Sequence, residues 1–323
     1  MKKQILRKPM ALLLALIMVI SLLPTVSLAA EEADAQVSSS TLATDGDVVV
    51  PSTTPTTIDL SAATENISIT SGGDYTLTGS TTVYNVSIDT TDVENKIVNL
   101  TLDGASIQIP DDYNKKDVSV LSISGDATVN MIVKEGTCNT LSNVCTSGGI
   151  GVTVTGNSDL NITDTGTLNI TGTSYTLYAK TGSSVSINDA TVNIITSMNG
   201  KWVNCIELNG AALTVNSGNL NATIPEKNSA SSMATSATIY IDSASSFTQN
   251  GGTVKVINQA KVTTSCYGIY DKGVVSINGG TLFAYGQTNG VHINSGLMGI
   301  DDDAVFLAAS GNVATFDSMK NAV

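Results

Sequence analysis

The feature that most constrains this fold is a short sequence pattern that occurs five times between residues 159 and 286. In each copy, two segments of alternating apolar and polar side chains flank a small polar turn. Alternation with a period of two is typical of a half-buried β-strand, and Asn, Asp and Gly at the turns tolerate left-handed backbone angles. The pattern predicts a repeated unit of strand, tight turn and strand. The copies are DLNITDTGTLNITG from Asp159, SVSINDATVNI from Ser184, ALTVNSGNLNATI from Ala212, SFTQNGGTVKVI from Ser246 and VVSINGGTLFAYG from Val274.

The spacing of the copies indicates which repetitive fold they form. Equivalent apolar positions, separated by 25, 28, 34 and 28 residues, are Leu160, Val185, Leu213, Phe247 and Val275. A third alternating segment lies between copies: TLYAK, NCIEL, TIYID, YGIYD and GVHIN. Three short strands in each repeat predict an all-β fold, a right-handed parallel β-helix over residues 58–323, since a propeller blade would need four strands in about 40 residues.

Repetition is also the expected source of stability. The inward Val, Ile and Leu of one coil are buried only when neighbouring coils stack above and below. The Asn residues that recur at the turns are expected to form a ladder, each amide bonding to the next. Two longer loops interrupt the repeats, PDDYNKKD from Pro110 and PEKNSASSMATS from Pro225. Such insertions usually lie on one surface of a solenoid.

The first 57 residues are expected to lie outside the β-helix. Lys2, Lys3, Arg7 and Lys8 precede an apolar stretch, and small residues follow at Ser27–Ala30, which predicts a secretory signal peptide over residues 1–30. Residues 31–57 contain Ser, Thr and Pro without apolar periodicity and are predicted to be a linker. We therefore expect a secreted, extracellular protein that is either soluble or held at the cell surface by its partners, with no membrane insertion after the signal peptide is removed.

The net charge disfavours polyanionic partners. Without residues 1–30, eleven basic and 28 acidic residues remain, which gives a net charge of −17. Nucleic acids and anionic membranes are poor partners for such a surface. The same segment contains no arginine.

Four cysteines follow the predicted signal peptide, at positions 138, 145, 205 and 266. Their spacing matches no tight CxxC pattern, and with a single histidine a structural zinc site is not expected. In an oxidising compartment Cys138 and Cys145 are candidates for a disulfide that closes a short loop. The alternative is that they are buried or reduced thiols.

The stretches YTLTG, VNLTLDGASI, GTLNITG and CYGIYDKGVVSINGGTLFAYG resemble the extracellular bacterial family of carbohydrate-binding domain-containing proteins. The resemblance covers roughly residues 60 to 315. It implies a right-handed β-helix on a pectate-lyase-like scaffold, and polysaccharide binding without catalysis. Members carry acidic residues implicated in calcium binding in a Gly-Asp-Gly-Ile-Asp-Ser-Asn-Gly run, and here Tyr267 and Tyr270 replace the two aspartates.

The enzymatic alternatives require catalytic residues that are absent from this chain or scattered along it. Lyases of this scaffold generally use an Arg or Lys base near calcium, and no arginine follows residue 30. Hydrolases need converging carboxylates. The only acidic triple is Asp301, Asp302 and Asp303, for which we weigh a solvated turn, calcium ligation by oxygen donors and catalysis. We expect no required cofactor, with calcium as the candidate ligand of this triple.

The third segment of each repeat suggests a binding surface. If its apolar residues face the interior, the neighbouring outward positions form one column: Tyr178, Glu207, Tyr240, Tyr270 and His292. Trp202 is expected in a loop beside its second rung. Aromatic rings pack on the apolar faces of sugars, so the column is a candidate carbohydrate platform. The alternative is that these side chains only stabilise the sheet by stacking between rungs.

The function predicted from the sequence is therefore non-catalytic binding of an extracellular polysaccharide, from plant cell walls or a similar source. A second hypothesis is a surface adhesin or structural stalk without specific sugar affinity. A polysaccharide lyase or hydrolase is a third, which the missing catalytic residues disfavour.

Overall fold

The structure is a computed structural model that describes residues 55–111, 118–146, 148–196, 203–226, 236–260 and 265–311. The predicted signal peptide and all but the end of the predicted linker lie outside these residues. β1 begins at Thr56, inside the segment expected to be linker. Nearly every described element is a short strand, and these strands form three sheets.

Each sheet is a row of parallel strands that come from successive coils. Sheet A contains β1 (Thr56–Asp59), β3 (Gly73–Thr78), β6 (Ile97–Leu102), β9 (Thr128–Val133), β12 (Asp159–Thr163), β15 (Ser184–Ile187), β18 (Ala212–Val215), β21 (Ser246–Gln249), β24 (Val274–Ile277) and β27 (Leu297–Ile300). Sheet B contains β2 (Ile67–Ile69), β5 (Val86–Asp89), β8 (Ser119–Ser124), β11 (Ile150–Val154), β14 (Tyr175–Lys180), β17 (Val203–Asn209), β20 (Ser236–Ile241), β23 (Cys266–Asp271) and β26 (Asn289–Ile293). Sheet C contains β4 (Ser80–Thr81), β7 (Ser106–Ile109), β10 (Cys138–Asn143), β13 (Thr167–Gly172), β16 (Thr191–Thr196), β19 (Asn219–Ile224), β22 (Thr253–Asn258), β25 (Gly280–Gly286) and β28 (Ala304–Ser310).

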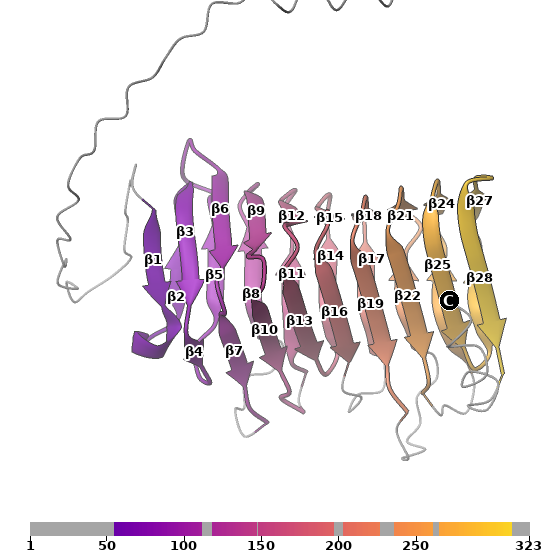
Figure 1. The fold of residues 1–323 in the computed structure, drawn as a ribbon, viewed down its shortest axis with the longest axis horizontal. Coiled ribbons are helices and arrows are strands. Elements are labelled where there is room, and N and C mark those ends of the chain that lie inside the picture. Colours follow the sequence, from indigo (N-terminus) through magenta and orange to yellow (C-terminus); the bar gives the residue numbers. More distant parts are fainter. Residues whose placement is uncertain are drawn as a thin grey trace, which may run out of the picture. The chain divides into compact units, whose positions relative to one another are not determined.

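Along the described chain every coil runs through sheet B, then sheet A, then sheet C, as in β14, β15 and β16. Figure 1 shows the strands side by side, with colours that change steadily from the indigo β1 to the yellow β27 and β28. The predicted equivalent positions are paired across neighbouring strands: Leu160 with Val185, Val185 with Leu213, Leu213 with Phe247 and Phe247 with Val275. The predicted parallel β-helix with three strands per coil is therefore confirmed.

The core is a continuous column of aliphatic side chains inside the coils. Val185, Leu213, Phe247 and Val275 are each at most 1% exposed. Full burial of such a side chain stabilises a fold by about 1.5–3 kcal/mol, and each one is covered by the coils on both sides. At the N-terminal end, a short 3-10 helix, η2 (Leu60–Ala62), places Leu60 in the same cluster.

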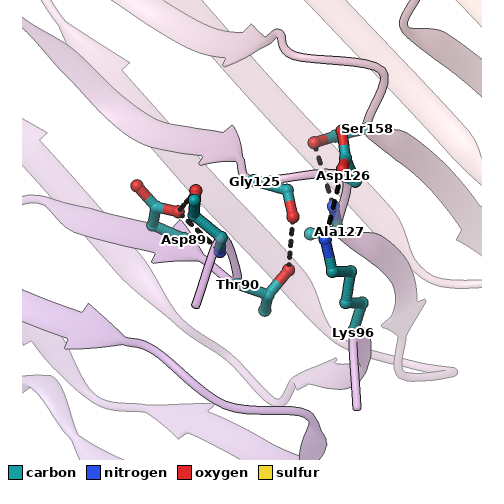
Figure 2. A network of polar contacts seen from close by, with 8 residues as sticks. Asp89, Thr90, Lys96, Gly125, Asp126, Ala127 and Ser158 are labelled. Carbon is teal, nitrogen blue, oxygen red and sulfur yellow. Dashed lines mark hydrogen bonds and ion pairs between the residues drawn. The ribbon is translucent and has the colours of Figure 1, made fainter. Parts of the chain in front are cut away.

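The turns between sheets B and A depend on left-handed backbone and polar contacts. Gly125 and Asp126, which connect β8 to β9, have φ values of 77° and 56°. Figure 2 shows this corner: the Thr90 hydroxyl donates to the Gly125 carbonyl oxygen at 3.0 Å, and Lys96 pairs with Asp126 at 3.1 Å. These bonds join one coil to the next, so the corner is part of the stack. The same figure also labels Asp89, Ala127 and Ser158.

The turns between sheets A and C carry the predicted asparagine ladder. Asn216 donates its Nδ2 to Oδ1 of Asn188 at 2.9 Å, Asn250 to Asn216 at 2.7 Å and Asn278 to Asn250 at 2.8 Å. The ladder hypothesis is confirmed at these turns. Two further amide ladders, not predicted from the sequence, run along the outer faces of sheets A and C and contain Asn99, Asn130 and Asn161, and Asn169, Asn193 and Asn221.

Length variation between coils is concentrated at the third corner, between a sheet C strand and the next sheet B strand. Two residues connect β13 to β14, whereas eleven connect β19 to β20. The loops predicted from Pro110 and Pro225 both lie in this position. The expectation that insertions share one side of the β-helix agrees with this order of strands.

Candidate functional site

The predicted column lies on the outer face of sheet B, one residue from each of five neighbouring strands. Tyr178 pairs with Glu207, Glu207 with Tyr240, Tyr240 with Tyr270, and Tyr270 with His292. All five side chains are half-buried. The preceding residues in four of these strands point into the core and are at most 1% exposed: Leu177, Ile206, Ile239 and Ile269. The predicted register is therefore confirmed, while a role in sugar binding stays a prediction.

Aromatic stacking is concentrated at one end of the column. The Tyr240 and Tyr270 rings have centroids 5.6 Å apart and planes within 4° of parallel. His292 stacks on Tyr270 at 5.2 Å with an angle of 28°. Parallel rings at these separations are offset from one another, so a neighbour in the column does not cover a whole ring face.

Tyr267 belongs to the same cluster and was not predicted. Its ring lies 4.7 Å from His292 and 5.2 Å from Tyr270. Residues three apart in a regular strand point to opposite faces, so the alternation is interrupted between Tyr267 and Tyr270. The signal in the sequence is Gly268, because an isolated glycine inside a strand pattern indicates a bulge or a close backbone approach.

A lysine completes this cluster. Lys272 donates from its Nζ to the Tyr240 hydroxyl at 3.0 Å, and the ammonium lies 5.4 and 5.5 Å from the Tyr240 and Tyr270 ring centroids. The hydrogen bond with Tyr240 raises the pKa of Lys272. We call Tyr240, Tyr267, Tyr270, Lys272 and His292 the C-terminal patch.

The other end of the column repeats this combination of rings and ammonium on a smaller scale. The Tyr175 and Tyr178 rings lie 4.9 Å apart at an angle of 32°, and Lys180 lies 4.8 Å from the Tyr178 ring centroid. Burial, followed by the negative charge of Glu207, raises the pKa of Tyr178. We call Tyr175, Tyr178 and Lys180 the N-terminal patch.

Glu207 separates the two patches. Its Oε2 accepts a hydrogen bond from Asn204 Nδ2 at 2.9 Å. Burial is the main cause that raises the pKa of Glu207, and the negative charge of Asp242 adds to it. The column is thus two aromatic patches with a half-buried carboxyl group between them, not one continuous row of rings. Trp202, expected beside the second rung, lies outside the described residues.

The acidic triple lies in an exposed turn, and calcium ligation there stays a prediction. Asp301, Asp302 and Asp303 are exposed in the turn between β27 and β28, and calcium needs six to eight converging oxygens. Within the ranges described by the structure, no three His, Cys, Asp or Glu side chains converge as metal ligands. The backbone N–H of Asp301 donates to Ile277 O at 2.9 Å, as that of Asn278 does to Gln249 O at 2.7 Å. Asp301 therefore occupies the corner position that follows the asparagine ladder.

The disulfide considered from the sequence is corrected. The Cys138 thiol is exposed and the Cys145 thiol is buried, and no disulfide joins these two described residues. Cys138 begins the six-residue strand β10, and Cys145 follows two residues after that strand ends at Asn143. At about 3.3 Å per residue, this extended segment holds them beyond the roughly 7 Å Cα separation that a disulfide tolerates.

The fold and this face define a class of protein: a parallel β-helix that presents tyrosines, lysines and a carboxyl group in register on one outer sheet. In the described part of the chain no helix is long and apolar enough to cross a membrane. The chain belongs to the carbohydrate-binding domain-containing protein family, whose family model matches residues 63–312. No curated protein and no solved structure matches the chain.

Proposed function

We propose that this protein binds an extracellular polysaccharide without cleaving it, and that the sheet B column is its binding surface. The observation that carries the proposal is the register of the column, which places two aromatic patches along one line parallel to the stack of coils. Successive rungs are about 4.8 Å apart, close to the length of one sugar unit. A glycan chain from plant cell walls or a similar source can then lie along the column.

The two patches have complementary roles in this proposal. Ring surface left uncovered by the offset stacking of Tyr240 and Tyr270 packs against apolar sugar faces. Lys272 and Lys180 bring N–H donors to the same surface. Glu207 adds a hydrogen-bonding group between the patches, so sugar hydroxyls meet polar partners along the line.

The described carboxyl groups at and near the column fit binding without cleavage. Glycoside hydrolysis commonly uses two carboxyl groups, and the column contains one, Glu207. The nearby Asp242 accepts hydrogen bonds at its Oδ1 from the Gly210 and Ala244 backbone N–H groups and from the Ser245 hydroxyl. Asp242 thus has a role in the corner turn, and no arginine is present after residue 30 to act as a lyase base.

Affinity gel electrophoresis in a panel of soluble polysaccharides tests the proposal. At least one glycan should retard the protein, and a variant with Tyr240→Ala and Tyr270→Ala should lose most of that retardation because its stacking surface is gone. Tyr84→Ala, a tyrosine outside the column, is the matched control. Equal retardation of the double variant and the wild type would refute the platform. Runs with and without a chelator test whether calcium contributes.

The second hypothesis, an adhesin or structural stalk, is favoured by the three amide ladders. They join successive coils and stabilise the stack without any ligand. On this hypothesis the tyrosines only stack between rungs, and no polysaccharide in the panel retards the protein. We propose extracellular localisation for either function, on the basis of the predicted signal peptide.

A further inference from the structure

A groove lies on the outer face of sheet C, away from the sheet B column. Its volume is about 850 Å³, within the range of small-molecule and glycan sites. It crosses five neighbouring strands, from β16 to β28, a length of roughly 19 Å at the usual strand spacing. Its polar lining consists of Thr191, Asn219, Asn221, Thr253, Lys255 and Thr281, and its apolar end of Val305, Phe306 and Leu307.

An amide ladder ends inside this groove. Asn193 donates its Nδ2 to Oδ1 of Asn169, and Asn221 donates to Asn193, both at 2.9 Å. On the next strand the partner of Asn221 is Lys255, so the series of asparagines stops there. No side chain of the described residues donates a hydrogen bond to Oδ1 of Asn221, which leaves an amide acceptor at the groove surface.

Lys255 likewise has no side-chain partner among the described residues. Lys96 and Lys134 form ion pairs at 3.1 and 2.6 Å with Asp126 and Asp103, whereas Lys255 has neither an ion pair nor a side-chain hydrogen bond within the described ranges. None of the described residues that line the groove is acidic, although the chain contains 28 acidic residues. The groove thus combines an unused acceptor and an unused cationic donor on adjacent strands.

We propose that this groove binds an N-acetylated glycan, a chain of N-acetylhexosamine units. An acetamido group has an N–H that can donate to Oδ1 of Asn221 and a carbonyl oxygen that can accept from the Lys255 ammonium. The acetamido group then extends the amide ladder, with a ligand amide in the place of a protein amide. The threonine hydroxyls suit sugar hydroxyls, and the apolar end near Val305 and Leu307 suits acetyl methyl groups. This site is on a different sheet from the proposed sheet B site, so the two proposals can be tested independently.

Isothermal titration calorimetry with two tetrasaccharides tests this proposal. Tetra-N-acetylchitotetraose, here called chitotetraose, and cellotetraose share a β-1,4-linked backbone, and only the former carries acetamido groups. The wild type should bind chitotetraose roughly three- to tenfold more tightly, the effect of one or two net hydrogen bonds. Lys255→Met and Asn221→Thr should each remove most of this preference. The matched controls are Lys134→Met and Asn161→Thr, which change the same kinds of side chain outside the groove and outside its amide ladder and should keep the preference.

Other outcomes would overturn the proposal. Equal affinity for the two tetrasaccharides, or no binding of chitotetraose, shows that the groove does not recognise acetamido groups. An unchanged preference in Lys255→Met, or the same loss in Lys134→Met, shows that Lys255 is not the contact. The variant with Tyr240→Ala and Tyr270→Ala should retain the preference, and loss of it there would place the ligand on sheet B instead. Circular dichroism confirms that each variant is folded.

Discussion

At the scale of single residues, Glu207 shows how the outer face differs from an ordinary strand surface. Its carboxyl group lies between Tyr178 and Tyr240 in register, and burial raises its pKa. The folded state therefore holds the proton more strongly than the unfolded chain does. Between the ordinary glutamate pKa and the raised one, stability must fall as the pH increases.

Replacing this carboxyl group should remove that dependence. Glu207→Gln keeps an acceptor for Asn204 and carries no charge, so above the raised pKa the variant should be more stable than the wild type. Below the ordinary pKa the two proteins should be equally stable. Urea unfolding at several pH values measures the difference. Glu135→Gln, in an exposed turn, is the control, and a Glu207→Gln curve parallel to the wild type at all pH values would contradict the prediction.

Which residues form the patches was only partly predictable. The alternation identified Tyr178, Tyr240, Tyr270 and His292, because in a regular strand the residue next to an inward-pointing residue points outward. It could not identify Tyr267, since its outward position depends on the interruption at Gly268. Lys272 lies beyond the end of β23, where alternation carries no information about direction, and only the three-dimensional contact with Tyr240 reveals it.

At the scale of elements, the interruption in β23 depends on a close approach of three strands. A β-carbon on Gly268 would clash with the Gly290 carbonyl oxygen and lie 2.9 Å from that of Tyr285. Backbone atoms cannot move aside as a flexible side chain can. A β-carbon at position 268 would therefore force these strands to shift and would move Tyr267 relative to Tyr270 and His292.

Gly268→Ala should destabilise the protein by about 2–3 kcal/mol, the upper range for overpacking, and should weaken any glycan binding that depends on the C-terminal patch. Urea unfolding measures the first effect. Gly299→Ala is the control, because a β-carbon at Gly299 meets no atom within 4 Å. Similar stability for the two variants would show that the strands can separate at Gly268 without cost.

Other features of the elements differed in how far sequence could predict them. The asparagine ladder was predictable because identical residues recur at identical turns, which the parallel register stacks on one another. The separation of Cys138 from Cys145 was not, because it depends on β10 occupying the interval between them. The exposed corner position of Asp301 agrees with the solvated turn weighed for the acidic triple, but the sequence run alone does not show that Asp301 follows the asparagine ladder.

At the scale of the whole β-helix, stability should depend on contacts between coils. Phe247 is completely buried between Leu213 and Val275 of the adjoining coils. Its loss would leave a cavity shared by three coils, which can collapse only if the coils move together.

Phe247→Ala should therefore reduce the free energy of unfolding by about 3–5 kcal/mol, measured by urea denaturation. Ile97→Ala removes an apolar side chain that is 52% exposed and should change stability by less than about 1 kcal/mol. Equal effects would mean that the interior of the stack contributes no more than its surface, contrary to the description of the core.

The concentration of length variation at the corner between sheets C and B has an evolutionary and practical consequence. Eleven residues at one coil and two at another leave the pairing of sheet B intact on both sides. Genetic insertions at this corner can therefore accumulate without changing which side chains of the strands point inward and which point outward. A foreign peptide spliced there would be displayed beside the tyrosine face, and the protein could acquire new loops while the alignment of its older surface is inherited unchanged.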